Sequence, residues 1–247
     1  MSLSSEYRVQ FAWRNWSRIL DRLPQLSGQV ILDLGCGVGD IATALVARGA
    51  HVIGLDNNEE LLYEARSMQL AGAEFRMHDL GKPLECTGAD GIWSSFVTAY
   101  FAQLQPVLQS WAESLKTGGW IALTEIDDLL GHEPVSERTR KLLDAFAEEA
   151  FAAGLYDFHM GHKLEGHLEC AGFSISHAFT VEDQELSFQG PAGPEVIQAW
   201  RARFERMPLL RKFCGIEFPR VRSEFLDCLA SAEHVSVAKV HCCIATR

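Results

Sequence analysis

Short apolar runs and amphipathic segments alternate along the first half of the chain. Nearly uninterrupted apolar runs are typical of strands buried on both faces, and the run at residues 30–34 predicts such a strand. We expect four further strands at residues 51–55, 74–77, 91–96 and 120–124. Apolar residues at helical spacing predict helices over residues 40–48, from 57 or 58 to about 70, and over 103–115. Strands and helices of this length in alternation form a parallel sheet with helices on both faces, so we expect an α/β fold.

The two ends of the chain add further elements. Residues 6–21 show helical spacing and predict one N-terminal helix, and residues 136–153 and 163–171 predict two more helices before a sixth strand at 173–179. An apolar stripe follows, which predicts a helical cap and consists of Val196, Ile197, Trp200, Phe204 and Met207. Two interpretations of the last strand stay open: it lies at 235–247 after an inserted cap, or at 184–188 before a C-terminal extension.

Composition and charge narrow the class of protein. The 247 residues are 47% hydrophobic and 22% charged, which excludes wholesale disorder. The net charge of −11 argues against general binding to nucleic-acid phosphates, and no apolar run is long enough for a membrane helix. The seven cysteines form no Cys-x-x-Cys pair and no secretory signal precedes them, so we expect reduced thiols and a cytoplasmic location.

A glycine-rich turn, Gly35-Cys-Gly-Val-Gly39, joins the first expected strand to its helix. Turns of this kind lie at the carboxyl edge of an open sheet, where ligands bind, and glycine lets the backbone approach a ligand closely. Asp33 precedes the turn, Asp56 ends the second strand and Asp79 follows the third. Because the carboxyl ends of parallel strands share one edge, we expect these three carboxylates to converge on one ligand site.

The segment Val30-Ile-Leu-Asp-Leu-Gly-Cys-Gly-Val-Gly39 closely resembles the first motif of class I S-adenosylmethionine-dependent methyltransferases. The resemblance covers about residues 28–125 and the expected sixth strand. It implies a Rossmann-like seven-stranded sheet, mostly parallel with a late antiparallel strand, accompanied here by an N-terminal helix and a helical cap. It also implies that the cofactor is S-adenosyl-L-methionine.

The resemblance assigns to the cofactor a set of residues at the ends of the first four strands: Asp33, Gly35, Cys36, Gly37, Gly39, Asp56, Asn57, Asp79, Leu80, Ser95 and Phe96. It implies that Asp33 and the glycine turn hold the methionine end. Asp56 would bind the ribose hydroxyls, with Asn57 beside the adenine. Asp79 would receive the adenine amino group, with Leu80 against the ring, and the pair after strand four would border the methyl group.

Two other functions remain as alternatives. A NAD(P)-dependent oxidoreductase also carries an acidic residue after its second strand, but its fingerprint is Gly-x-Gly-x-x-Gly. Here the third glycine comes one residue early, and Asp40 would repel a pyrophosphate. The other alternative is a catalytically silent module that binds S-adenosylmethionine.

The methyl acceptor is less well defined. Methyltransferases of nucleic-acid bases and of glutamine typically have an Asn/Asp-Pro-Pro-Tyr-like motif after strand four, whereas this chain has Ser94-Ser-Phe-Val97. We therefore expect methyl transfer to an O or N atom of a small molecule. The candidates for catalysis lie near the strand ends and in the connections beyond them: Tyr100, Glu125, His132, His159 and His162. Because His159 and His162 lack a clear third partner, we expect no metal site.

The expected cap differs in charge from the rest of the chain. Residues 201–222 contain seven basic and two acidic side chains, a net charge of +5. One hypothesis is that a cap arginine binds an anionic acceptor such as a carboxylate or phosphate; the alternative is ion pairing with the acidic body. We divide the chain, as a single domain, into an N-terminal helical segment at 1–26, a cofactor-binding core at 27–188, the cap at 189–234 and a final strand at 235–247. The N-terminal helix either closes over the cofactor or packs on the sheet.

Overall fold

A seven-stranded sheet organises the computed structural model, which describes residues 3–247. The strand order is β3-β2-β1-β4-β5-β9-β7, so the order reverses between β1 and β4. The bounds are β1 Val30–Leu34, β2 His51–Asp56, β3 Ala73–Met77, β4 Ala89–Ser95, β5 Leu115–Asp127, β7 Ser174–Val181 and β9 Lys239–Thr246. Strand β9 runs antiparallel to both of its neighbours, β5 and β7, and all other neighbouring pairs of this sheet are parallel. The predicted α/β fold class, with a late antiparallel strand, is confirmed.

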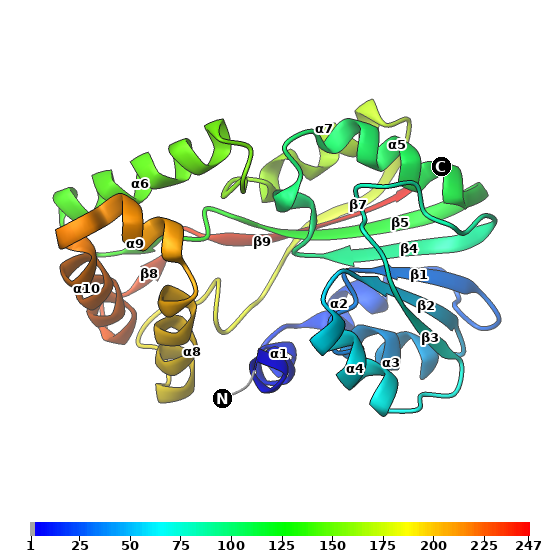
Figure 1. Ribbon diagram of the computed structural model, residues 1–247, viewed down its shortest axis with the longest axis horizontal. Coiled ribbons are helices and arrows are strands. Elements are labelled where there is room, and N and C mark those ends of the chain that lie inside the picture. The colour runs from blue at the N-terminus through cyan, green and yellow to red at the C-terminus, as the bar shows by residue number, and fades with distance from the viewer. Residues whose placement is uncertain (1–2) are drawn as a thin grey trace.

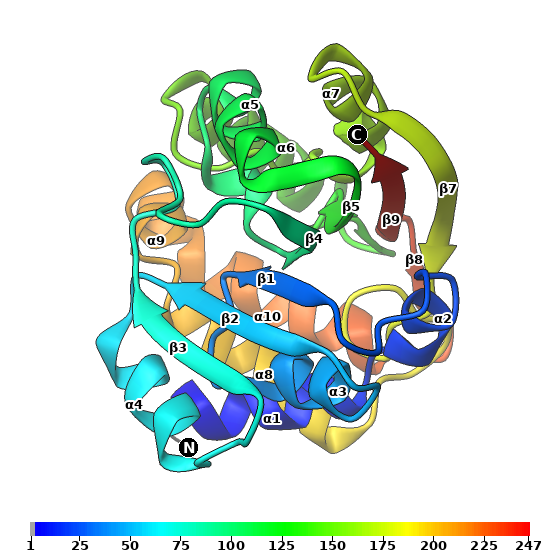
Figure 2. The same cartoon turned by 90° about the vertical axis from the view of Figure 1, so that its right-hand side faces the viewer.

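Helices cover both faces of the sheet (Figure 2). One face packs on α2 (Trp16–Leu20), α3 (Asp40–Val46) and α4 (Glu59–Ser67), and the other packs on α5 (Leu104–Ser114) and α7 (Leu164–Cys170). Leu32 and Ile31, neighbours in β1, belong to the two different clusters of buried side chains. Alternate residues of the strands therefore face opposite layers, which explains the nearly continuous apolar runs in the sequence.

The cap is a separate group of helices at one end of the sheet (Figure 1). It contains α6 Glu137–Ala152, α8 Pro194–Glu205, α9 Pro208–Cys214, the short helix η3 Gly215–Glu217 and α10 Phe218–Ala230. The apolar stripe of α8 is buried, with Trp200 and Phe204 fully inaccessible. Helix α6 contacts α9 and therefore packs within the cap. From the sequence we expected it in the cofactor-binding core, which spans residues 27–188.

The N-terminal segment departs from its prediction. It forms two helices, α1 Leu3–Ala12 and α2, and not one helix over 6–21. Asn15 caps α2 by accepting a hydrogen bond from the backbone N–H of Arg18, and the N–H of Asn15 donates to the carbonyl of Glu182. The break therefore comes from pairing with the chain beyond β7, which helical spacing alone does not reveal.

The last strand of the sheet is β9, and residues 184–188 carry only isolated bridge pairing. The predicted strand over 235–247 is interrupted, because β8 (Val235–Ser236) pairs with β6 (His132–Glu133) in a separate small sheet. The N–H groups of Val237 and Ala238 both donate to the carbonyl of Gly131. The short helices η1 Thr98–Tyr100 and η2 Gly161–Lys163 complete the fold. None of the helices that the structure describes is both long and apolar enough to cross a membrane.

Candidate cofactor and acceptor site

The glycine turn lies between the end of β1 and the start of α3. Gly35, Gly37 and Gly39 have φ values of 77°, 51° and 85°, a left-handed backbone that favours glycine. A Cβ at Gly37 would meet no atom within 4 Å, so the backbone there borders open space. A Cβ at Gly35 would lie 2.3 Å from a methyl group of Val97, and Cys36 between these glycines is buried. The turn is therefore largely buried, with free space beside Gly37 and tight packing at Gly35.

Asp33 points a buried carboxylate towards this turn from within β1. It is 2% exposed, and its Oδ2 has no hydrogen-bond partner among the described residues. Burial, together with the charge of Asp56, raises the pKa of Asp33 to about 8. An unpartnered buried carboxylate is costly, and a cationic ligand group would satisfy it. The amino group or sulfonium of S-adenosylmethionine is such a cation, so Asp33 fits the methionine end of that cofactor.

Asp56 ends β2 on the other side of the turn. Its Oδ2 accepts the N–H of Gly37 at 2.9 Å, and its Oδ1 accepts the N–H of Asn58 at 2.9 Å. Asn58, and not Asn57, caps α4, so the exposed Asn57 is left at the edge of the site. Asp33 and Asp56 are therefore brought together around the turn, as the sequence predicts for two of its three carboxylates.

The third carboxylate, Asp79, lies at the rim. Its side chain is 59% exposed, 3.5 Å from the ammonium of Lys82, and it accepts the N–H of Gly81. Leu80 is buried beside it and packs with the α5 layer, and its carbonyl accepts the indole N–H of Trp111. Protein contacts hold both residues in place. Their role in binding adenine, which the resemblance implies, stays a prediction.

The end of β4 carries a second unusual backbone position. Phe96 has a φ of 59°, and its N–H donates to the carbonyl of Thr124 on β5. The guanidinium carbon of Arg14 lies 4.8 Å from the centre of the Phe96 ring. Ser95 beside it has a buried hydroxyl with no partner in the described part of the chain. This strand end is next to the reversal in strand order, where open α/β sheets bind their ligands.

Glu125, a candidate for catalysis, is fully buried at the end of β5. Its Oε1 accepts the hydroxyl of Thr98 at 3.0 Å and the N–H of Ala99 at 3.1 Å, whereas its Oε2 has no partner among residues 3–247. Burial raises the pKa of Glu125 to about 7. Tyr100, the other candidate nearby, packs edge to face on Tyr156 with ring centres 4.8 Å apart. Glu125, a carboxyl group with a pKa near 7, thus lies beside two tyrosines.

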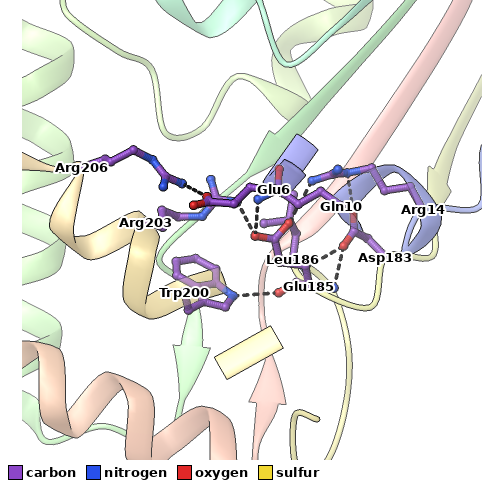
Figure 3. Close-up of polar contacts among 9 residues, drawn as sticks. All are labelled: Glu6, Gln10, Arg14, Asp183, Glu185, Leu186, Trp200, Arg203 and Arg206. Carbon is purple, nitrogen blue, oxygen red and sulfur yellow. Dashed lines mark hydrogen bonds and ion pairs between the residues drawn. The ribbon is translucent and has the colours of Figure 1, made fainter. Parts of the chain in front are cut away.

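A buried ion cluster joins the N-terminal helices to the cap (Figure 3). Glu185 is fully buried and accepts hydrogen bonds from Gln10, Arg14 and Arg203. Burial acts to raise its pKa, but the charges of Arg203 and Arg14 outweigh burial and hold the pKa below its ordinary value. No pattern in the sequence predicts this cluster, because its members lie far apart along the chain.

Helix α1 spans from the sheet layer to the cap. Arg8 lies 3.4 Å from Glu64 on α4, and Glu6 lies 2.6 Å from Arg206, the residue that follows α8. Burial raises the pKa of Tyr7, and the charge of Asp56 raises it further. The side of α1 that carries Tyr7 therefore faces the cofactor end of the sheet. The structure therefore favours the hypothesis that α1 covers this edge.

The candidate histidines fall into two places. The Nδ1 atoms of His159 and His162 lie 3.4 Å and 2.7 Å from one oxygen of Asp127, and both rings are about half exposed. His132 lies elsewhere, fully buried in the cap and stacked on His234. Its ring also contacts the rings of Trp200 and Phe225. Within residues 3–247, no group of three or more His, Cys, Asp or Glu side chains is arranged to hold a metal ion.

Most of the cap cations are paired. Arg211 and Arg222 both bind Glu205, and Arg220 binds Glu217 and Glu224. These partners belong to the cap itself, so the pairing differs from the expected pairing with the acidic body. Arg203 differs from these arginines because its partner, Glu185, is fully buried and lies beyond β7.

Comparisons with known proteins agree with this geometry. A family model described as a methyltransferase domain matches residues 25–170. The chain is 30% identical over 113 residues to a malonyl-[acyl-carrier protein] O-methyltransferase of Enterobacter lignolyticus, covering 46% of this chain and 45% of that protein. It is 26% identical over 232 residues to a trans-aconitate 2-methyltransferase of Methylobacterium radiotolerans, covering 87% and 82%. The chain spans about half the length, or less, of several curated relatives that it matches.

Solved structures show the same fold. An S-adenosylmethionine-dependent methyltransferase from Mesorhizobium loti aligns with a TM-score of 0.57 and 19% sequence identity, over 94% of this chain and 97% of that one. The matched family model indicates a methyltransferase, and the glycine turn and Asp33 fit a cationic cofactor such as S-adenosylmethionine. The chain belongs to the methyltransferase domain family, and its cofactor is S-adenosylmethionine.

Proposed function

We propose that this chain transfers the methyl group of S-adenosylmethionine to an O or N atom of a small molecule. The observation that carries the proposal is the buried carboxylate of Asp33, which has no partner for its Oδ2 and lies beside an open glycine turn. A cationic ligand without phosphate fits this site, whereas a pyrophosphate would meet Asp40 at the start of α3. The family match supports the same choice over a NAD(P)-dependent oxidoreductase.

Each residue of the site has a role under this proposal. Bound S-adenosylmethionine supplies an electrophilic methyl group on a sulfonium. Asp33 and the backbone of Gly37 hold the methionine end, and Asp56 binds the ribose hydroxyls while keeping its bond to the turn. Phe96 borders the transferred group, and α1 excludes water from the edge. Most of the catalytic effect comes from holding the two reactants in line.

Glu125 is the group that takes a proton when the acceptor atom must lose one. Its pKa of about 7 suits proton transfer at neutral pH, and its Oε2 is free for that purpose. Tyr100 lies beside it and orients the acceptor. The cap, residues 189–234, together with α6 shapes the acceptor side of the site, and residues 27–188 hold the cofactor.

The acceptor is a small molecule that carries an anionic group. Two relatives are named for trans-aconitate and malonyl-[acyl-carrier protein], and both names describe carboxylate compounds. The seven free cysteines support a reducing, cytoplasmic location. The net charge of −11 supports a partner other than nucleic acid.

Calorimetric titration tests the cofactor part of the proposal. S-adenosylhomocysteine should bind the full chain, whereas NADH and NADPH should not. Binding of a nicotinamide cofactor in preference would overturn the proposal. Incubation with methyl-labelled S-adenosylmethionine and a mixture of small metabolites then tests transfer, and failure to label any metabolite would favour the catalytically silent module.

A further inference from the structure

Two tyrosines near Glu125 have hydroxyl groups that make no hydrogen bond in the described part of the chain. The rings of Tyr100 and Tyr156 contact each other from η1 and from the loop before η2. Within residues 3–247, neither hydroxyl makes a hydrogen bond, and Tyr100 is 64% exposed. Desolvation by surrounding protein nevertheless raises the pKa of both groups. Both hydroxyls therefore stay protonated and offer hydrogen-bond donors to a ligand.

Arg203 approaches the same place from α8. Its Nη2 donates to Glu185 at 2.5 Å, and its guanidinium carbon lies 5.0 Å from the centre of the Trp200 ring. These contacts fix the side chain, whereas its Nη1 makes no hydrogen bond in the described part of the chain. The side chain is 23% exposed, and its Nε is buried without a hydrogen-bond partner among the described residues. The charge of Arg203 also acts on Tyr100 and Tyr156.

The ion cluster locates Arg203 relative to the end of β4. Glu185 binds Arg203 with Oε1 and Arg14 with Oε2. The guanidinium of Arg14 in turn lies over the Phe96 ring. Through Glu185 and Arg14, Arg203 is therefore connected to the strand end where we place the methyl group.

We propose that Arg203, together with the hydroxyls of Tyr100 and Tyr156, binds a carboxylate of the methyl acceptor and selects carboxylic acids as substrates. This inference rests on the proposed function, because it assigns the acceptor part of that site. A planar guanidinium edge and two neutral donors match the two oxygens of a carboxylate. A phosphate carries up to two charges and would meet one guanidinium that is already paired with the buried Glu185.

Glu185 is a positioning residue in this arrangement. It receives donors from α1, from the segment between α1 and α2, and from α8, and so holds Arg203 at the site without touching the acceptor. Removing Arg203 alone would leave the buried Glu185 short of one partner. A test must therefore change the pair together.

The test uses the full chain and compares four variants. Arg203→Gln/Glu185→Gln replaces the ion pair by a neutral hydrogen-bonding pair, and Tyr100→Phe and Tyr156→Phe each remove one hydroxyl. Arg222→Gln is the matched control, because Arg222 is a cap arginine that binds Glu205 on the outer surface. The complex with S-adenosylhomocysteine is titrated by calorimetry with malonate, succinate, trans-aconitate, malonamide and phosphoethanolamine.

We expect at least one of the three carboxylates to bind the wild-type complex more tightly than malonamide and phosphoethanolamine. The double variant should weaken that binding by about tenfold to a hundredfold, and each tyrosine variant by about threefold to tenfold. Arg222→Gln should leave it unchanged, and S-adenosylhomocysteine should bind all variants alike. If the double variant fails to fold, the tyrosine variants decide, because they leave the ion cluster intact.

Different failures point to different errors. If S-adenosylhomocysteine does not bind the wild-type chain, the proposed function itself is overturned. If it binds but no carboxylate does, if phosphoethanolamine binds in preference, or if the variants bind the carboxylate as well as the wild type, the role of Arg203 is overturned and the cofactor assignment stands.

Discussion

At the scale of single residues, Asp33 is well placed to bind a cation but lowers the stability of the folded protein without its ligand. Its carboxylate is buried without a partner for Oδ2, and burial together with Asp56 raises its pKa to about 8. A raised pKa of an acid means that the folded state takes up a proton more readily than the unfolded chain. The associated stability is complete below the ordinary pKa of 3.8 and is lost as the pH rises from there to about 8. A bound cation restores it by pairing with the ionised form.

Replacing Asp33 by asparagine should therefore separate stability from binding. At pH 8.5 the free variant should be more stable than the wild type by roughly 1–3 kcal/mol, because no ionised carboxylate is buried. The stabilisation that S-adenosylhomocysteine gives the wild type should be lost or greatly reduced. Thermal unfolding with and without S-adenosylhomocysteine measures both effects. A variant that keeps the full ligand-induced shift would contradict the assignment of Asp33 to the methionine end.

Glu125 provides a second prediction at this scale. As a base it acts when ionised, so kcat/KM should rise as the pH increases through about 7, the pKa that burial gives this carboxyl group. Glu125→Gln should lower kcat by roughly a hundredfold and remove this rise. The exposed Glu165 on α7 is the matched control, and Glu165→Gln should keep the wild-type profile. An unchanged profile in the Glu125 variant would exclude it as the proton acceptor.

At the scale of elements, the histidine pair under the cap has a defined protonation state. His234 Nδ1 lies 2.9 Å from the carbonyl of Gly190, so it must donate there, and its Nε2 must accept from Nδ1 of His132. The Nε2 of His132 is then an unprotonated, buried atom with no partner among the described residues. Burial lowers the pKa of His132 to about 3 and also lowers the pKa of His234. Both rings are therefore held neutral between β6 and α10.

Acid should weaken the packing of these elements. The folded pKa of His132 lies below its ordinary value of 6.5, so its contribution to stability is complete above pH 6.5 and is lost as the pH falls from there towards 3. The loss approaches about 1.4 kcal/mol per pH unit for each such histidine. His132→Gln keeps a donor to His234 without a titrating ring, so urea unfolding between pH 7 and 5 should show a smaller loss. The exposed His51 is the control, and His51→Gln should behave as the wild type.

The same scale shows what sequence patterns could and could not predict. The strands and helices around the glycine turn were predicted within a few residues, because periodicity, glycine and capping residues are all local properties. The break between α1 and α2 was not predicted, because it depends on pairing of Asn15 with Glu182 far along the chain. The strand at 235–247 was interrupted for the same reason, by pairing of β8 with β6. The buried Glu185 cluster gave no local pattern at all.

At the scale of the whole molecule, three distant parts of the chain meet at Glu185. Gln10 comes from α1, Arg14 from the segment before α2 and Arg203 from α8, while Glu185 itself lies beyond β7. The indole N–H of Trp200 also donates to the carbonyl of Glu185. The cluster thus fixes the cap and the N-terminal helices against the same edge of the sheet, which holds the cofactor and acceptor sides of the site in one geometry.

Removing this buried carboxylate should destabilise the whole chain far more than removing an exposed one. Glu185→Ala leaves two guanidinium groups short of a partner and should cost about 3–5 kcal/mol of unfolding free energy. The matched control is Asp21→Ala, which removes the exposed pair of Asp21 and Arg48, 3.2 Å apart, and should cost no more than about 1 kcal/mol. Urea unfolding measures both, and amide exchange should show faster opening of α1 and α8 together in the Glu185 variant. Equal losses in the two variants, or opening of only one of these helices, would mean that Glu185 does not tie the N-terminal helix to the cap.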